Sequence, residues 1–174
     1  VSPRERRVAA VLAAAHFAAL PVSRRARRVA LYLEYASELG TRPLLDWLWT
    51  HGVETYVPRL RAGAMHFVRM LPGTPLRAGA FGIPEPSGRL VRGSLRRMDI
   101  ILLPLTGFDA RGHRLGTGGG YYDRALAAPR PARKPLLIGY AYALQQVQAV
   151  PVEAWDVRLD AVVTEQGVMQ WPIG

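Results

Sequence analysis

A glycine-rich stretch at residues 114–124 is the feature that most narrows what this chain can fold into. Four of five consecutive positions are glycine (Gly116 and Gly118 to Gly120), and an arginine stands on each side. An apolar run at 99–105 precedes the glycines, and a helix-compatible run at 122–128 begins as they end. Glycine backbone can turn its N–H groups inward and let a phosphate approach without a Cβ in the way. The stretch therefore predicts a nucleotide-phosphate site between a strand and a helix, although it is neither GxxxxGKS/T nor a regular GxGxxG.

Helix-like and strand-like patterns alternate along the rest of the chain. Ser2 and Glu5 have the spacing of a capping box around Pro3, which predicts a helix to about residue 20. Thr41 is expected to cap a second helix that ends near Gly52. Strands are expected at 29–35, 54–57 (closed by the next proline), 65–70, 100–105, 136–140 and 161–164, with a long irregular excursion at 71–98. The alternation predicts one α/β domain over residues 1–174, a three-layer α/β/α sandwich with a mainly parallel central sheet, as in Rossmann-like folds.

Ligands in such sheets bind beyond the carboxyl ends of the strands. The loop that holds Glu38 follows one expected strand, Arg59 follows another, and the glycine-rich stretch follows a third. We therefore expect these three distant segments to converge on one crevice.

The composition excludes several classes of protein. Hydrophobic residues make up 49% of the 174 residues and charged residues 21%, which is typical of a globular domain. The chain has no cysteine, so disulfides, cysteine nucleophiles and thiolate metal sites are excluded. Neither a membrane-spanning apolar run nor a signal-peptide pattern is present, and a cytoplasmic enzyme is expected.

The charge of the chain favours an anionic partner. Lys and Arg number 23 against 13 Asp and Glu, a net charge of +10, and all of these basic residues except Lys134 are arginine. Nucleic acid, a nucleotide or a polyanionic small molecule would fit this balance, and so would a merely solvated basic surface.

Two aspartates are candidate magnesium ligands. Asp123 directly follows the glycines and tyrosines, where a carboxylate oxygen could hold Mg²⁺ beside a phosphate. The alternative for Asp123 is an acid favoured by the start of a helix. Asp156 could be a second ligand or a loop residue, and spacing does not decide between these.

Other side chains have open roles. Tyr121 and Tyr122 could stack on a planar ligand or fill the core, and Glu38 could accept hydrogen bonds from an amino-bearing heterocycle or be a solvated loop acid. The four histidines show neither ligand spacing nor a partner for a catalytic triad; they are His16, His51, His66 and His113.

Residues 99–124 closely resemble the signature of the 5-formyltetrahydrofolate cyclo-ligase (methenyltetrahydrofolate synthetase) family. The family pattern is an aspartate and an apolar run, then P-x-x-x-F-D-x-x-G-x-R-L-G-x-G-x-G-Y-Y-D. The resemblance extends to residues 38–41, 56–58, 82–86 and 151–156, and covers about residues 2 to 166.

This resemblance implies an ATP- and Mg²⁺-dependent conversion of 5-formyltetrahydrofolate, with or without a polyglutamate tail, to 5,10-methenyltetrahydrofolate, ADP and phosphate. The formyl oxygen would attack the γ-phosphate, and N10 of the same folate would then close the ring as phosphate leaves. No protein nucleophile is implied, which fits phosphoryl transfer by positioning and charge neutralisation. We expect a monomer.

Site residues carry over position by position from the resemblance. The ATP site would consist of Arg114, Leu115, Gly116, Thr117, Gly118, Gly119, Gly120, Tyr121 and Tyr122. The folate site would consist of Leu33, Glu38, Leu60 and Phe81 together with Thr117, Gly118, Gly119, Gly120 and Tyr121. Asp123 and Asp156 would hold the magnesium, and Arg114, Tyr122 and Asp123 would supply positioning and charge.

The chain departs from the family pattern at several points. Thr117 and Gly119 stand where many members have a cation, Gly40 replaces a common acid, and Leu60 replaces an aromatic residue of some members. Members usually begin with a Lys/Arg-rich helix of the form K-x-x-x-R, and we expect that this helix is missing before Val1. Two alternative functions stay open: a family member with the nucleotide site but little turnover, and a basic nucleic-acid-binding domain.

Overall fold

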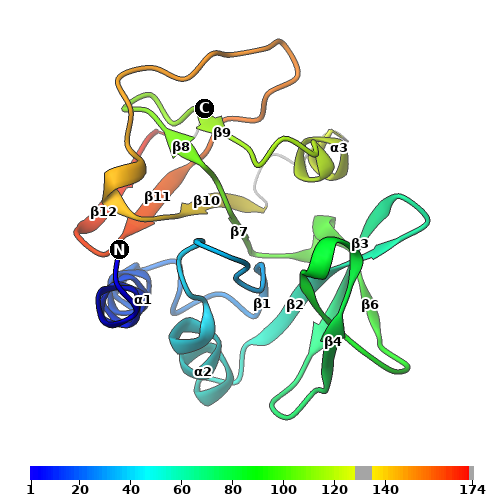
Figure 1. The fold of residues 1–174 in the computed structure, drawn as a ribbon. Helices are drawn as coiled ribbons and strands as arrows, with labels where there is room; N and C mark the ends of the chain where they lie inside the picture. Colours follow the sequence, from blue (N-terminus) through cyan, green and yellow to red (C-terminus); the bar gives the residue numbers. More distant parts are fainter. Residues whose placement is uncertain (128–134, 173–174) are drawn as a thin grey trace.

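The computed structural model describes residues 1–127 and 135–172, which form an α/β domain around one large mixed sheet. The sheet has the strand order β12-β11-β10-β7-β1-β2-β3-β6 (Figure 1). Its strands are β1 (Arg28–Ala30), β2 (Glu54–Arg61), β3 (Ala64–Met70), β6 (Arg92–Gly93), β7 (Ile100–Leu103), β10 (Leu136–Tyr140), β11 (Ala161–Thr164) and β12 (Gly167–Gln170). Two separate hairpins are formed by β4 (Leu76–Ala78) with β5 (Pro84–Pro86) and by β8 (Gly107–Phe108) with β9 (Arg114–Leu115). The helices are α1 (Pro3–Ala19), α2 (Arg42–Thr50) and α3 (Tyr121–Leu126), with 3-10 turns η1 (Ala80–Gly82), η2 (Leu95–Arg97) and η3 (Ala143–Gln145).

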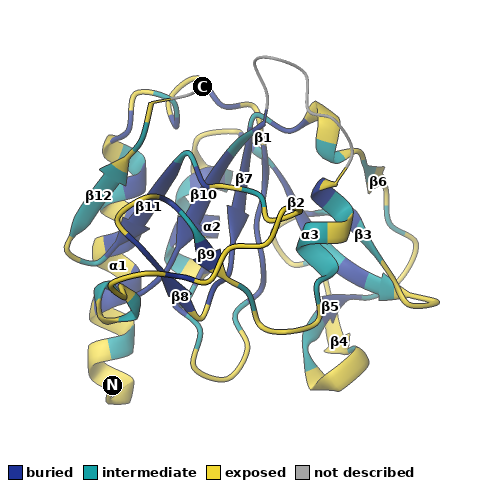
Figure 2. Ribbon diagram, turned by 90° about the horizontal axis from the view of Figure 1, so that it is seen from above, coloured by how far each residue is buried: buried dark blue, intermediate teal, exposed yellow. Residues whose placement is uncertain are grey.

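The centre of the sheet is parallel, as the sequence predicts. Strands β11, β10, β7, β1 and β2 pair in parallel, whereas β12, β3 and β6 add antiparallel strands at the two sides. The central strands are apolar and buried along their whole length, as expected for a sheet covered on both faces (Figure 2).

Three layers are present, and the two outer layers differ. Helices α1 and α2 cover one face of the sheet, while α3 and the β8–β9 hairpin lie on the other (Figure 1). Each face has its own hydrophobic cluster, one around Phe17 and Leu44 and one around Ile101 and Phe108. Within the described residues, no helix is long and apolar enough to cross a membrane.

The first helix forms as its sequence indicates. Ser2 accepts a hydrogen bond from the N–H of Glu5, and the carboxylate of Glu5 accepts one from the N–H of Ser2, so the predicted capping box is confirmed. An alanine face of α1 packs close to the backbone at Gly40. A Cβ at position 40 would lie 3.3 Å from the Cβ of Ala10, so glycine at this position lets the helix and the loop approach closely.

A second contact joins α1 to the same loop. Arg6 donates from Nη1 to the carbonyl oxygen of Ala36 at 2.9 Å, and Ala36 has a φ of 53°, in the left-handed region that non-glycine residues rarely adopt. The first helix therefore fixes the backbone of the loop that carries Glu38.

Several element boundaries differ from the sequence prediction. The strand expected at 29–35 is a strand only over Arg28–Ala30, and the prediction for 31–35 is wrong: Leu31 keeps one backbone hydrogen bond to β2, Leu31, Tyr32 and Leu33 are buried in the core, and the chain then turns outward to the exposed Tyr35. Strand β2 continues through Pro58 to Arg61. The carbonyl of Tyr56 accepts from the N–H of Leu31. The nitrogen of Pro58, two residues later, faces the same side of β2 at a point beyond the end of β1, so the N–H that proline lacks is not needed for pairing there.

The other differences concern helices and loops. Thr41 is the N-cap residue of α2, as expected, but its side chain makes no capping hydrogen bond, because its hydroxyl lies 2.6 Å from Oε2 of Glu34 and 3.0 Å from the carbonyl oxygen of Tyr32 and is directed at these acceptors. The excursion at 71–98 is not wholly irregular, because it contains the β4–β5 hairpin and β6. Helix α3 begins one residue earlier than expected, at Tyr121, and the expected end at Ala128 lies outside the described residues.

Candidate functional site

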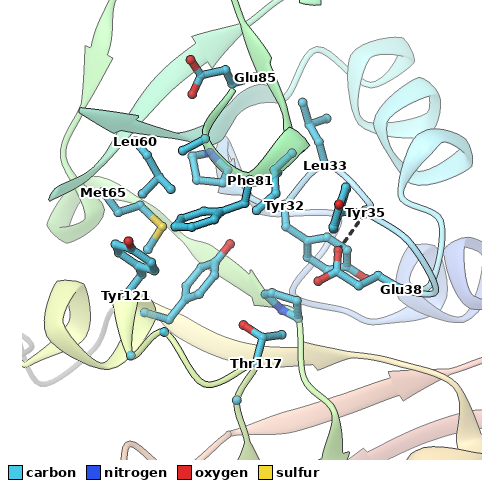
Figure 3. A pocket seen from close by; sticks show the side chains of 18 of the residues that line it. Tyr32, Leu33, Tyr35, Glu38, Leu60, Met65, Phe81, Glu85, Thr117 and Tyr121 are labelled. Carbon is cyan, nitrogen blue, oxygen red and sulfur yellow. Dashed lines mark hydrogen bonds between the residues drawn. The ribbon is translucent and has the colours of Figure 1, made fainter. Parts of the chain in front are cut away.

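One cavity of about 440 Å³ lies beyond the carboxyl ends of β1, β2 and β7. Figure 3 shows side chains from four segments around it. The segment after β1 contributes Tyr32, Leu33, Tyr35 and Glu38; β2 and β3 contribute Pro58, Leu60 and Met65; the β4–β5 hairpin contributes Ala80, Phe81, Ile83, Pro84 and Glu85; and the remaining wall is Pro104, Arg114, Gly116, Thr117, Gly119, Gly120, Tyr121, Tyr122 and Asp123. The convergence expected for the Glu38 loop and the glycine-rich stretch is thus observed.

The glycine-rich stretch forms one wall of the cavity as open backbone. Gly118 and Gly120 have φ values of 97° and 63°, which an L side chain rarely adopts. A Cβ at Gly118 would meet no atom within 4 Å, so space remains beside the loop for a ligand. Thr106 holds the base of the loop, because its hydroxyl lies 3.1 Å from the carbonyl oxygens of both Leu115 and Gly116.

Arg114 places a buried positive charge next to this loop. Its side chain is 4% exposed and pairs through Nη2 with Oδ1 of Asp123, whose side chain is 27% exposed. The Nε atom of Arg114 is buried without a hydrogen-bond partner in the described structure. A buried N–H of a cation that lacks an acceptor is suited to an anionic group of a ligand.

Glu38 provides a carboxylate on the opposite side of the cavity. The N–H of Tyr35 donates to Oε2 of Glu38 at 2.9 Å (Figure 3). Burial is the main cause that raises the pKa of Glu38, the neighbouring carboxylate of Glu34 raises it further, and the hydrogen bond from Tyr35 opposes the rise. Burial likewise raises the pKa of Tyr32, whose hydroxyl lies 2.8 Å from the carbonyl oxygen of Leu39 and 3.1 Å from that of Tyr140.

The two tyrosines after the glycines have different surroundings. Tyr122 lines the cavity and also packs edge-on against Phe67 of the core at 6.3 Å, and burial raises its pKa. Tyr121 lines the cavity beneath the guanidinium of Arg124, which lies 4.8 Å from the centre of its ring. Tyr122 therefore packs against the core, as one alternative predicts, and also faces the cavity, while stacking on a ligand stays a prediction.

Some residues named from the sequence lie outside the cavity wall. Leu115 is half exposed, Gly118 stands just behind its neighbours in the loop, and neither lines the cavity. Asp156 is exposed in a turn, where it accepts from the N–H of Glu153 at 2.8 Å, and it is not part of the wall. Arg59 does not follow a strand but lies within β2, buried beside Glu85. Among residues 1–127 and 135–172, no group of three or more His, Asp or Glu side chains is arranged to hold a metal ion.

Sequence reasoning missed a buried aspartate that supports the site. Asp109 is 1% exposed and accepts hydrogen bonds from the backbone N–H groups of Arg111, His113 and Val150 and from Nδ1 of His113. Burial would raise the pKa of Asp109, but these hydrogen bonds outweigh it and lower the pKa to about 2. Its position in the F-D-x-x-G motif was the available signal. Glu34 and Glu85 were also missed, because their sequence surroundings do not show that they are buried.

The fold and the site are those of an α/β protein with a ligand pocket at the carboxyl ends of parallel strands. Residues 1–165 match the 5-formyltetrahydrofolate cyclo-ligase family. The chain is 40% identical over 151 residues to the 5-formyltetrahydrofolate cyclo-ligase of Escherichia coli K12, covering 84% of this chain and 82% of that one. It is 39% identical over 140 residues to the Haemophilus influenzae protein of the same name, covering 78% and 74%. The chain belongs to the 5-formyltetrahydrofolate cyclo-ligase family.

Solved structures agree with this assignment. The solution structure of 5,10-methenyltetrahydrofolate synthetase from Aquifex aeolicus matches with a TM-score of 0.82 and 33% identity, over 98% of this chain and 84% of that chain. A 5,10-methenyltetrahydrofolate synthetase from Mycoplasma pneumoniae shares the fold with a TM-score of 0.74 at 23% identity, over 95% and 90% of the two chains.

Proposed function

We propose that this chain converts 5-formyltetrahydrofolate to 5,10-methenyltetrahydrofolate with hydrolysis of ATP to ADP and phosphate. The observation that supports this most directly is a single cavity with a glycine-rich loop and Arg114 on one side and the Glu38 carboxylate on the other. Such a cavity can hold a triphosphate and an amino-bearing heterocycle side by side. The names and identity of the curated relatives support the same reaction.

The phosphates of ATP fit the glycine-rich wall. Arg114 is the buried cation there and its Nε lacks an acceptor; of the glycines in the loop, Gly118 has open space beside it, and Gly116 and Gly120 lie next to the guanidinium groups of Arg114 and Arg124. In this proposal, the residues from Arg114 to Tyr122 bind the nucleotide, and Arg114 stabilises the charge that moves between phosphate oxygens during transfer.

The folate fits the opposite and upper walls. Glu38 would accept hydrogen bonds from the amino-pyrimidine edge of the pterin, and Leu33 lies directly beside it in the wall. Leu60 and Phe81 add apolar surface for the rings (Figure 3).

The chemistry needs positioning and charge. In the first step the formyl oxygen forms a bond to the γ-phosphorus as the bond to ADP breaks. In the second step N10 bonds to the formyl carbon and loses its proton, and the phosphate leaves with the former formyl oxygen and takes up that proton. None of the described residues that line the cavity is a Ser, Cys, His or Lys, so no strong nucleophile is at hand; the side chains there that could accept a proton are the carboxylates of Glu38, Glu85 and Asp123. The side chains would hold the two substrates in line and exclude water.

Magnesium binding is part of the proposal through Asp123 and Asp156. Mg²⁺ in nucleotide sites is commonly held by one or two carboxylates together with phosphate oxygens. Asp123 lines the cavity and would divide its carboxylate between Arg114 and the ion. Asp156 is exposed and outside the wall, so Asp123 is the better supported ligand of the two. A cytoplasmic location and a monomeric state remain proposals that rest on the sequence.

A turnover assay tests the proposed function. We expect the absorbance of 5,10-methenyltetrahydrofolate to appear with 5-formyltetrahydrofolate, ATP and Mg²⁺, and to depend on each of the three. The assay should use this chain and the natural protein with any residues that precede Val1. Absence of product from both would reject the reaction, and tight salt-dependent binding of RNA without ATP turnover would favour a nucleic-acid-binding domain instead.

Folate recognition by Glu38 predicts a dependence on pH. Because burial raises the pKa of Glu38, protonation should begin at a higher pH than for an ordinary glutamate, and the KM for the folate should rise as the pH falls through that pKa. Glu38→Gln should raise the folate KM about tenfold or more at neutral pH, change the ATP KM little, and remove this pH dependence. Folate KM measured from pH 5 to 8 checks this; equal effects on the two substrates would contradict the pterin role.

A further inference from the structure

The β4–β5 hairpin forms a wall of the cavity without belonging to the main sheet. Its two strands pair only with each other among the described strands, and the turn η1 at its tip places Phe81 over the cavity (Figure 3). Phe81 is 74% exposed and has a φ of 59°, a backbone conformation that costs about 1–3 kcal/mol in a residue other than glycine. Next to it, a Cβ at Gly82 would come within 3.6 Å of the Tyr35 hydroxyl, so the tip spans the cavity to the Glu38 loop. Something in the structure must hold this exposed tip in place.

Glu85 is the residue that attaches the hairpin to the sheet. Its side chain is 7% exposed, and its Oε1 accepts from Arg77 at 2.7 Å, within the hairpin, and lies 3.9 Å from Nε of Arg59 on β2. The side chain of Arg59 is 9% exposed, and Glu85 is its only acidic partner in the described part of the chain. Nε of Arg59 has no hydrogen-bond partner in the described structure, so the two side chains interact through charge alone; because a buried cation without a counter-charge is strongly unfavourable, this pairing favours β5 beside β2.

Gly79 fits against the same carboxylate. A Cβ at position 79 would lie 2.6 Å from Cδ of Glu85, which is closer than any real contact. The turn can therefore sit on the carboxyl group of Glu85 only because position 79 is glycine. In Figure 3 the carboxylate of Glu85 points away from Phe81 and from the centre of the cavity, so it is placed to hold the wall and not to contact a ligand.

We propose that Glu85 is a positioning residue for folate binding: through Arg59 it seats the β4–β5 hairpin, and the seated hairpin places the ring of Phe81 over the substrate. This inference rests on the proposed function of the cavity. It assigns an effect on the affinity for the folate, and not on that for ATP, to a residue of the cavity wall that acts through the position of Phe81.

A double-mutant cycle tests the proposal. Glu85→Gln alone and Phe81→Ala alone should each raise the folate KM about tenfold, with the ATP KM and kcat changed less than about threefold. Because Glu85 acts through Phe81, Glu85→Gln in the Phe81→Ala background should add less than about twofold. Additive effects, or equal increases in the KM of both substrates, would overturn the proposal.

Glu54→Gln is the matched control. Glu54 is on β2, the strand that carries Arg59, and like Glu85 it lies between two arginines. Its carboxylate is 3.3 Å from Nε of Arg28 and 3.7 Å from Nη2 of Arg69, but it does not line the cavity. The folate KM of this control should stay within about twofold of the parent.

If Glu85→Gln does not fold, as judged by thermal unfolding, the cycle is run with Gly79→Ala instead. This variant keeps all charges and displaces the carboxylate of Glu85, and the same pattern of KM values is expected. Absence of turnover by the parent chain would reject the proposed function and this proposal with it, whereas turnover with an additive cycle would reject this proposal alone.

Discussion

Replacement of Arg114 by glutamine should lower kcat/KM for ATP by about 100-fold or more, the largest effect on activity that we expect from a single change. The guanidinium is the buried cation of the glycine-rich wall, and its Nε is free to donate to a phosphate. Glutamine retains hydrogen-bonding capacity but not charge, so the loss should be larger in phosphoryl transfer than in folate binding. Steady-state kinetics with each substrate varied in turn would measure this.

Stability must be measured in parallel, because Arg114 also neutralises Asp123. Asp123 is partly exposed and can be hydrated when the arginine is lost, so we expect a cost of about 1–3 kcal/mol and a folded protein. Arg42→Gln is a suitable control, since it removes an exposed arginine from an ion pair with Asp46 on α2 and Arg42 does not line the cavity. Turnover by Arg114→Gln within threefold of the parent would remove Arg114 from the proposed ATP site.

Asp109→Ala should produce the largest loss of stability. The change leaves three backbone N–H groups without their acceptor in a buried position. We expect the free energy of unfolding to fall by about 3 kcal/mol or more, and the Tm by roughly 6–12 °C. Asp46→Ala, which removes an exposed carboxylate, should cost about 0.5 kcal/mol or less. Thermal and denaturant unfolding of the three proteins would decide; equal stability of both variants would contradict the role given to Asp109.

The pH dependence of this stability has a definite sign. The pKa of Asp109 is about 2 in the folded chain, below the value of about 4 for an unfolded aspartate. Its stabilisation is therefore fully present above about pH 4 and is lost as the pH falls toward 2. The difference in stability between the parent and Asp109→Ala should shrink over that interval and stay constant between pH 5 and 7.

Local chemistry explains which predictions from sequence succeeded. The capping box at Ser2 and Glu5 and the apolar strands at 136–140 and 161–164 were predicted because spacing and apolar runs determine them locally; the strand predicted at 100–105 was found too, although it ends at Leu103. The glycine-rich wall was predicted for the same reason, since only glycine suits its backbone. Once a parallel sheet is inferred, the carboxyl ends of its strands bring Glu38 and that wall together.

Contacts between distant segments explain what was missed. Arg59 and Glu85 are separated by 26 positions (85 − 59), and neither has a sequence pattern that reveals burial or pairing. The same holds for Asp109 and Val150, which meet only in the folded chain. The end of β1 at Ala30 is another example, because the residues after it are apolar like a strand yet cover the core without pairing. Tertiary context, which a single sequence does not show, decides each of these.

Because Gly40 and Ala10 lie close together, the size of the residue at one of these positions limits the size of the residue at the other. A larger residue at either position would push the first helix away from the Glu38 loop, and the hydrogen bond from Arg6 to Ala36 would lengthen with it. A side chain at position 40 would therefore require Ala10 and this helix to shift by a few tenths of an ångström. In a chimera that takes only the first helix from a relative, we expect the Glu38 loop to be displaced. The helix and the loop should therefore be exchanged together.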